Sequence, residues 1–322
     1  MMDSMTRSAL PLTALGVMLA LLQGTPAEAL NTKSYVAAFG GDGNNCSTPI
    51  AACATFAQAL TQTVAGGEIT VVNTGDYGPM TITQSVHVTN DGAGEASIRV
   101  ASLNQAIVIE AGAGDIVSLR GLVIDGQGSG GNGIEPGRAS AVHVQNCVVR
   151  NFIGFGIAAD NRQLFVSDSI IFNNGSGTES GGIWIVLFGT DSANVVLDRV
   201  HLENNVLGLL ADGTQSTGNG AHVVIRDSVV SGNVSDGIRA VSRPGQAPAF
   251  VLVEHTSSVS NVAIGIHADG PRATILLKDN TVSRNGAGIS ATNSGQLISY
   301  GNNTNNNNLG PEGAPTAFFS QM

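Results

Sequence analysis

The sequence predicts an all-β solenoid, a single domain made of one short unit that repeats along the chain. From residue 133 onward, a Gly followed by Ile or Leu occurs seven times, at intervals of 23 to 29 residues. A short apolar run rich in β-branched residues precedes each pair, and an Asn usually lies between the run and the pair. A fixed period in this range is typical of stacked coils, in which each repeat buries its apolar face against its neighbours. The pairs are Gly133-Ile134, Gly156-Ile157, Gly182-Ile183, Gly208-Leu209, Gly237-Ile238, Gly265-Ile266 and Gly288-Ile289.

Each repeat predicts three short strands separated by turns. In one repeat, Val223-Val224-Ile225 is followed by the polar pair Asp227-Ser228 and by a second apolar couplet, Val229-Val230, before Asn233 and the Gly-Ile pair. Short runs rich in Val and Ile suit a half-buried pleated surface. Three such strands in a repeat of this length are the signature of a parallel β-helix, for which we expect roughly ten coils.

Asn and Gly are expected to form the tight turns of each coil. Both residue types tolerate the left-handed backbone that such turns need. Asn side chains can also stack from coil to coil and satisfy backbone groups in the turns. The Asn residues that follow the second strand are Asn151, Asn174, Asn204, Asn233, Asn261 and Asn285.

The strand pattern continues towards the N-terminus, so we expect the β-helix to span residues 67–303. The end coils of a solenoid expose unpaired strand edges and therefore need covers. The additional strands are expected at Ile69–Val72, Met80–Ile82, Val86–Val88, Ile98–Val100, Ala106–Ile109 and Ile116–Leu119.

A cap segment with one short helix is expected over residues 30–66. Thr55 is a candidate N-cap residue, and Phe56, Leu60 and Val64 then recur at helical spacing. A helix here would cover the first coil. At the other end, residues 304–322 are expected to form a tail in which Phe318-Phe319 covers the last edge.

The composition excludes two classes of partner. Charged residues make up 12% of the chain, aromatic residues 4%, and the net charge is -10. An acidic chain with only two lysines, Lys33 and Lys278, is a poor nucleic-acid binder, because nucleic-acid affinity depends on Lys and Arg contacts to phosphate. The same shortage of lysine argues against an anionic membrane surface as the partner.

The first 29 residues have the pattern of a secretory signal peptide. Arg7 precedes an apolar run from Ala14 to Leu22, and Ala27-Glu28-Ala29 supplies a small-x-small cleavage site. We expect cleavage after Ala29, an extracytoplasmic (secreted or periplasmic) mature chain, and no membrane span after cleavage. An uncleaved membrane anchor is the alternative.

The three cysteines fit an oxidising compartment. Cys46 and Cys53 lie seven residues apart, and a local disulfide between them is expected after export. Cys147 occupies a turn position where other repeats place Ser169 and Ser228, so we interpret it as a small packed residue and not as a nucleophile.

The N-terminal part of the mature chain resembles a known group of proteins. The segments Gly41-Asp42-Gly43-Asn44, Cys53-Ala54-Thr55-Phe56 and Gly75-Asp76-Tyr77 resemble the first coils of bacterial exported right-handed β-helix proteins of the pectate-lyase-like superfamily. The Gly-Ile repeats are similar to the body of the same proteins, so the resemblance covers roughly residues 35 to 303. It implies a right-handed parallel β-helix. Members with known activity are often lyases, hydrolases, epimerases or esterases that act on polysaccharides.

Candidate chemistry lies just after the Gly-Ile pairs. If the repeats stay in register, Arg239 and His267 lie one coil apart, with Asp269 close to them. These three are candidate catalytic residues, because a polysaccharide lyase needs a base and a cation that neutralises the sugar carboxylate. Trp184, the only Trp, is a candidate platform for a sugar ring, with Asp212 as a further substrate-binding candidate.

A calcium site is an alternative use of the same register. Asp160, Asp212 and Asp269 fall in one column of repeats, with Val186 and Val241 between them. Carboxylates are the ligands that Ca²⁺ prefers. A solvated row of turn residues explains the same aspartates without any function.

The sequence leaves three functions open. The first is an exported scaffold that binds carbohydrate or associates with the cell envelope, without a recognisable catalytic constellation. The second is a lyase or epimerase acting on acidic glycans through Arg239, His267 and the nearby aspartates. The third is a surface adhesion module. A polysaccharide or cell-surface glycan is the expected partner in each case, and we expect a monomer.

Overall fold

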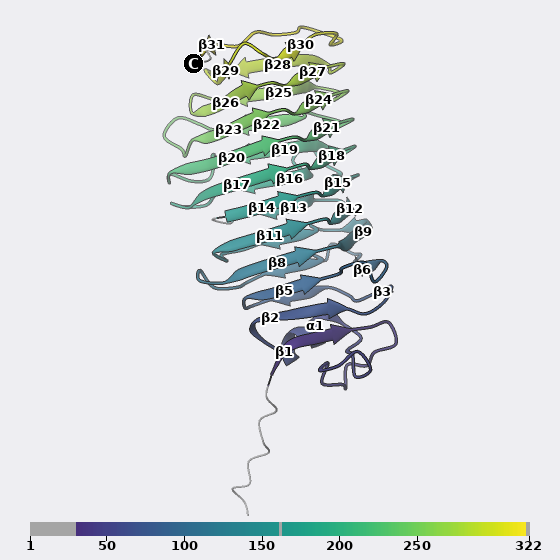
Figure 1. Cartoon of the computed structure of the whole chain (residues 1–322). Helices are drawn as coiled ribbons and strands as arrows, with labels where there is room; N and C mark the ends of the chain where they lie inside the picture. The colour runs from purple at the N-terminus through teal and green to yellow at the C-terminus, as the bar shows by residue number, and fades with distance from the viewer. Residues whose placement is uncertain (1–29, 161–162, 320–322) are drawn as a thin grey trace, which may run out of the picture. The chain divides into compact units, whose positions relative to one another are not determined.

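The computed structural model describes residues 30–160 and 163–319, and the chain from Asn31 onward forms one compact unit. Its strands form three parallel sheets, to which successive coils contribute one strand each (Figure 1). The predicted single-domain, right-handed parallel β-helix is therefore confirmed. The predicted signal peptide lies outside the described residues. No helix in the described part of the chain is long and apolar enough to cross a membrane.

The three sheets, which we call A, B and C, have 12, 10 and 9 strands. Sheet A contains β1 (Asn31–Val36), β2 (Thr63–Val71), β5 (Val86–Thr89), β8 (Ile116–Arg120), β11 (Ala141–Gln145), β14 (Gln163–Ser167), β17 (Ser192–Asp198), β20 (Gly220–Arg226), β23 (Ala249–Glu254), β26 (Ala273–Lys278), β29 (Gln296–Ser299) and β31 (Ala317–Phe318). Sheet B contains β3 (Gly75–Asp76), β6 (Ala96–Arg99), β9 (Leu122–Gly130), β12 (Val148–Phe152), β15 (Ile170–Phe172), β18 (His201–Glu203), β21 (Val229–Ser231), β24 (Ser257–Val259), β27 (Thr281–Ser283) and β30 (Thr304–Asn305). Sheet C contains β4 (Met80–Ile82), β7 (Ile107–Ile109), β10 (Ile134–Pro136), β13 (Phe155–Ala159), β16 (Gly181–Val186), β19 (Leu207–Asp212), β22 (Ile238–Val241), β25 (Ile264–Asp269) and β28 (Ala287–Thr292).

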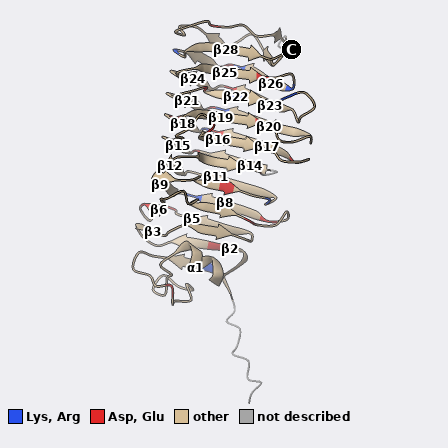
Figure 2. Ribbon diagram, turned by 180° about the vertical axis from the view of Figure 1, so that it is seen from behind, with Lys and Arg blue, Asp and Glu red and all other residues tan. Residues whose placement is uncertain are grey.

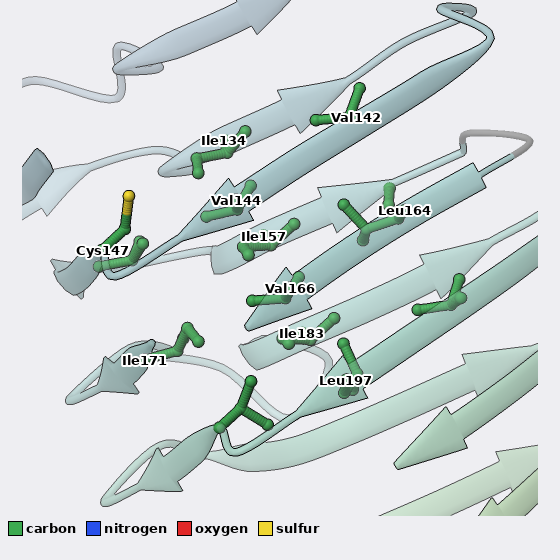
Figure 3. Packing of buried hydrophobic residues seen from close by; sticks show 14 of the residues in the cluster. Ile134, Val142, Val144, Cys147, Ile157, Leu164, Val166, Ile171, Ile183 and Leu197 are labelled. Carbon is green, nitrogen blue, oxygen red and sulfur yellow. The ribbon is translucent and has the colours of Figure 1, made fainter. Parts of the chain in front are cut away.

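The core is a set of aligned apolar columns inside the coil. Alternate residues of each short strand point inward, as the two-residue period of a strand requires. In sheet C, Ile134, Ile157 and Ile183 are paired from strand to strand and fully buried (Figure 3). Because apolar side chains at equivalent positions of successive coils stack on one another, every coil buries its apolar residues against the coils above and below.

The repeat glycines lie where a side chain would collide with the next coil. This corrects the expectation that they supply the left-handed backbone of tight turns. None of the seven has a positive φ. In β19, a Cβ on Gly208 would lie 2.3 Å from the carbonyl oxygen of Gly237 in the next coil, and 2.7 Å from a methyl group of Val230. Only a residue without a side chain fits where the chain passes this close to its neighbour.

An asparagine ladder connects the coils at the turn between sheets B and C. The backbone N–H of Asn205 donates to Oδ1 of Asn233 at 2.9 Å, and that of Asn233 donates to Oδ1 of Asn261 at 3.1 Å. The expected stacking of Asn is therefore present, but two of the six predicted members are wrong. Asn151 and Asn204 lie one residue before the ladder position, in left-handed turns with φ of 63° and 54°. The ladder consists of Asn174, Asn205, Asn233, Asn261, Asn285 and Asn308.

The first coils carry the predicted helix. Helix α1 (Phe56–Gln62) starts at Thr55, whose hydroxyl accepts the N–H of Gln58 at 3.1 Å, and it contacts β1, β2 and β4. It is shorter than predicted, because Val64 belongs to β2. At the other end, β31 (Ala317–Phe318) adds a last strand to sheet A by pairing with β29.

The cysteines lie in two different environments. Cys46 and Cys53 are joined in a disulfide, with their Cα atoms 5.0 Å apart. Cys147 is buried, and its backbone N–H donates to the hydroxyl of Ser169 at 3.1 Å in the stacked turn between sheets A and B. Burial raises the pKa of the Cys147 thiol to about 11, so this residue is a packed turn residue.

Candidate functional site

The outer face of sheet C carries the candidate residues. Trp184 in β16 pairs with Leu210 in β19, Leu210 with Arg239 in β22, and Arg239 with His267 in β25. The predicted register of Arg239 and His267 is therefore present. His267 is buried, with 8% of the residue exposed, and the Arg239 side chain is 32% exposed.

His267 is held between two oxygen atoms. Its Nδ1 lies 2.8 Å from Oδ2 of Asp236, and its Nε2 lies 2.9 Å from the hydroxyl oxygen of Thr292. Oδ1 of Asp236 accepts the backbone N–H of Ile264 at 3.1 Å, which fixes this carboxylate in turn. Neither ring nitrogen of His267 is free to act as a base on a ligand.

Asp269 is fully engaged by cationic and polar groups. It accepts from Nη2 of Arg239 at 2.7 Å and from the side-chain amide of Asn293 at 2.7 Å, and Nη1 of Arg243 lies 3.5 Å away. Burial by itself raises the pKa of this carboxyl, but the hydrogen bonds from Asn293 and Arg239 and the charges of the two arginines outweigh it and lower the pKa to about 2. Asp269 therefore orients the arginines and is too weak a base for proton abstraction at neutral pH.

The three aspartates of the predicted calcium site are not gathered. Val186 pairs with Asp212, Asp212 with Val241, and Val241 with Asp269, so neighbouring aspartates of the column, Asp160 included, lie two coils apart. Two coils correspond to roughly 9–10 Å. Calcium ligands lie about 2.3–2.6 Å from the ion. One cation cannot bridge these residues, and the described residues hold no group of three or more His, Cys, Asp or Glu side chains that could bind a metal.

Trp184 lies where two cavities meet on the outer face of sheet C. One cavity has a volume of about 220 Å³ and extends over β19 and β22 as far as Arg239 and Arg243. The other has about 280 Å³ and extends over β13, β10 and β7 as far as Glu110. Trp184 lines both. We call the two cavities together the sheet C groove.

The ring of Trp184 is held by residues of the coils before and after it. Phe155 in β13 stacks on it with ring centroids 5.1 Å apart and an angle of 27° between the planes. Leu207, Leu210 and Val241 pack against it from the following coils. These contacts hold an indole ring of limited mobility beside both cavities, which is the arrangement that a stacking platform needs.

Two buried N–H donors at this site lack a protein partner. Nε1 of Trp184 and Nε of Arg239 are buried and find no acceptor among the described residues. Both residues line the 220 Å³ cavity. An unsatisfied buried donor costs about 1–3 kcal/mol, and a ligand oxygen reaches these two donors only when the side chains around them move.

Asp160 lies in the second cavity. Burial raises the pKa of its carboxyl, and the negative charges of Asp191 and Glu135 raise it further, against the opposing charge of Arg138. Asp212 lines the first cavity, and its Oδ1 accepts the backbone N–H of Thr214 at 2.8 Å.

Several residues of the site were not singled out from the sequence. Asp236, Arg243 and Thr292 complete the network around His267 and Asp269, and Phe155 supports Trp184. Asp236 had one signal, its place immediately before the repeat glycine Gly237. The segments 175–181, 213–220 and 243–248 each contribute residues to the lining of the groove.

The comparisons with known proteins agree with this architecture. The model of a family described as "Right handed beta helix region" matches residues 84–250, which is half of the chain. The chain belongs to the right-handed β-helix family. Among curated proteins, none matches it significantly.

Two solved structures share the β-helix fold. The pectate lyase Pel9A aligns with a TM-score of 0.62 and 16% identity, over 83% of this chain and 74% of that protein. The alginate lyase from Paenibacillus sp. str. FPU-7 aligns with a TM-score of 0.54 and 12% identity, over 89% of this chain and 97% of that protein. At these identities the likeness concerns the fold alone.

Proposed function

We propose that this β-helix protein is an exported scaffold that binds an extended polysaccharide in the sheet C groove. The observation that carries the proposal is the position of Trp184, a ring fixed by Phe155 at the meeting point of two cavities. An aromatic ring held beside a cavity is the usual support for a sugar ring.

The direction of the groove favours a chain over a small molecule. It follows sheet C from β7 to β22, across six consecutive strands. Strands in a sheet lie about 4.8 Å apart, so the groove extends roughly 24 Å along the stack. Several sugar rings fit along such a distance, one of them over Trp184.

The unpaired donors fit the same ligand. Nε1 of Trp184 and Nε of Arg239 both require acceptors. Sugar hydroxyl and ring oxygens supply acceptors at short intervals along a polymer. The two solved structures named above are called a pectate lyase and an alginate lyase, so glycan binding is compatible with this fold.

Export supports a glycan partner outside the cytoplasm. The predicted signal peptide and the Cys46–Cys53 disulfide are both typical of an oxidising, extracytoplasmic compartment. We infer that the protein works there as a monomer, associated with a glycan or with the cell envelope. A surface adhesion role would use the same groove.

The alternative, a lyase or epimerase acting on acidic glycans, needs a free base beside a free cation. The nitrogens of His267 are taken by Asp236 and Thr292, and Asp269 holds both Arg239 and Arg243. We therefore propose glycan binding and not catalysis as the function. The test below also detects conversion of the glycan by the protein.

The test is calorimetric titration of the protein with a panel of oligosaccharides of equal length, followed by mass spectrometry of each mixture. We expect saturable binding of at least one oligosaccharide and unchanged ligand masses. Trp184→Ala should weaken that binding about tenfold or more. Phe172→Ala is the matched control, because Phe172 is a half-buried aromatic residue on sheet B outside the groove.

Two results would overturn the proposal. If no oligosaccharide binds, or if Trp184→Ala binds as well as the wild type, the groove is not a glycan site. Shortened chains with an unsaturated end would instead establish the lyase alternative.

A further inference from the structure

We propose that the sheet C groove selects a glycan that carries amino groups, in preference to neutral or acidic glycans. This inference rests on the proposed glycan-binding function and names the substrate class of the same groove. It follows from which charges line the groove, which of them are already paired, and how they are spaced along the stack.

The lining of the groove is strongly acidic. Charged residues are sparse over the β-helix as a whole (Figure 2). Within the groove, however, five carboxylates face two guanidinium groups. The carboxylates belong to Glu110, Glu135, Asp160, Glu179 and Asp212, and the guanidinium groups to Arg239 and Arg243.

Both arginines share a single buried carboxylate, that of Asp269. Arg239 donates to Asp269 at 2.7 Å, and Arg243 lies 3.5 Å from the same carboxylate oxygen. Asp269 is 4% exposed and lies behind the groove. A sugar carboxylate would have to compete with this buried ion for the arginines, while it approaches a surface of the same sign as its own.

Asp160 is the groove carboxylate whose charged form a positively charged ligand group would stabilise most. Its pKa is raised by burial and by the nearby charges of Asp191 and Glu135. The opposing charge of Arg138 does not cancel this shift. An ammonium group placed in the 280 Å³ cavity would relieve the repulsion between these carboxylates and supply a charge-assisted hydrogen bond.

The carboxylates are distributed along the stack, which favours a polymer over one cation. Glu110 follows β7, Glu135 lies in β10, and Asp160 follows β13. Glu179 precedes β16, and Asp212 ends β19, so five consecutive coils each provide one carboxylate. Consecutive coils are about 4.8 Å apart. A glycan with one ammonium group on each ring presents charges at a spacing of the same order.

Trp184 fits the same ligand. It lies in β16, between the coils that carry Asp160 and Asp212, and it lines both cavities. A Trp ring attracts a cation over its face as well as an apolar sugar surface. One residue therefore stacks on the sugar ring while the carboxylates on either side bind the amino groups.

The test compares three oligosaccharides of the same length by calorimetry: a glucosamine oligomer, its N-acetylated form and a galacturonate oligomer. At pH 5.5 the sugar amines carry a positive charge and ordinary carboxylates a negative one. We expect the glucosamine oligomer to bind about tenfold tighter than its N-acetylated form, and the galacturonate oligomer to bind weakest. Raising the salt from 0.05 M to 0.5 M should reduce the preference, because salt screens charges.

Asp160→Asn and Asp212→Asn should each reduce the preference for the amino form about threefold or more, with little change in affinity for the N-acetylated form. Asp227→Asn is the matched control, an exposed aspartate in the turn between sheets A and B. Melting temperatures of the three variants verify that each folds.

The outcomes separate the two proposals. If the N-acetylated or acidic oligomer binds as tightly as the amino form, and Trp184→Ala still removes binding, the charge-based selectivity is wrong and the glycan-binding groove stands. If none of the three binds, both proposals are wrong. If Asp160→Asn and Asp212→Asn behave like Asp227→Asn, the preference does not arise from the groove carboxylates, and the inference fails.

Discussion

Arg239 in β22, which lines the sheet C groove, donates from Nη2 to Oδ2 of the buried Asp269 in β25 at 2.7 Å. The carboxylate is 6% exposed in its side chain, and Arg243 and Asn293 approach it as well. A buried anion with this many partners is stabilised in its charged form. The pair therefore positions Arg239 in the groove and also stabilises the folded protein.

The first prediction concerns the pH dependence of this stabilisation. The folded pKa of Asp269, about 2, lies below its ordinary value of 3.8. A depressed pKa stabilises the folded state above the unfolded pKa, and this stabilisation is lost as the pH falls through the folded pKa. Asp269→Asn should therefore lower the free energy of unfolding by about 2 kcal/mol at pH 6, and by progressively less between pH 4 and pH 2.

Urea denaturation of both proteins across this pH range measures the difference. The exposed Asp227→Asn serves as the control, for which we expect a small and nearly constant difference. A difference for Asp269→Asn that does not change with pH would contradict the role of the carboxylate charge.

The second prediction concerns the repeat glycines. In Gly208→Ala, the new Cβ would lie 2.3 Å from the backbone oxygen of Gly237, and the backbone of both coils would have to move. We expect a loss of about 3 kcal/mol or more in the free energy of unfolding. Gly43→Ala is the control, because a Cβ there meets no atom within 4 Å. Equal melting temperatures of the two variants would disprove the spatial explanation of the repeat.

The third prediction concerns the asparagine ladder. Asn233→Ala removes the acceptor for the N–H of Asn205 and the side-chain donor to Asn261 and to the carbonyl of Leu202, all in the buried turn. Unsatisfied buried groups cost about 1–3 kcal/mol each, so we expect a loss of about 3 kcal/mol in chemical denaturation. Asn194→Ala, at an exposed position of β17, should change stability by less than about 0.5 kcal/mol. A comparable loss in both variants would refute the ladder's contribution.

The fourth prediction concerns Cys147. Its thiol is buried and has a pKa of about 11, while the other two cysteines are joined in a disulfide. Because the thiolate is the reactive form, a thiol reagent should not label the folded protein at pH 8. In denaturant, one thiol per chain should react. Rapid labelling of the folded protein would show that this turn opens or that Cys147 is accessible.

The fifth prediction concerns the support of Trp184. Phe155→Leu removes the ring that stacks on the indole at 5.1 Å. Such aromatic pairs contribute about 0.5–1.5 kcal/mol, so binding of the preferred oligosaccharide should weaken about threefold to tenfold. Because Trp184 is the only Trp, its fluorescence reports directly on the site, and we expect stronger quenching by acrylamide. Phe172→Leu is the control, and unchanged quenching in Phe155→Leu would contradict the supporting role.

Much of the fold is present in the local pattern of the chain. The period of the Gly-Ile pairs places Arg239 beside His267, as the strand pairing shows, because identical repeats stack in register. A separate local signal, an N-cap residue followed by apolar residues at helical spacing, predicts the helix start at Thr55. The errors are small shifts at turns, where Asn151 and Asn204 were chosen over the buried ladder position one residue later.

The sequence by itself determined that this chain is a parallel β-helix and which residues share an outer column, because both follow from a repeated period of strands, while its right hand was implied by the family resemblance. Only the tertiary structure decided how those side chains are used. The pairing of Asp236 with His267 joins residues 31 apart, and that of Arg239 with Asp269 joins residues 30 apart. Such contacts depend on side-chain direction and burial across coils, and the cavities beside Trp184 depend on loops that vary from repeat to repeat.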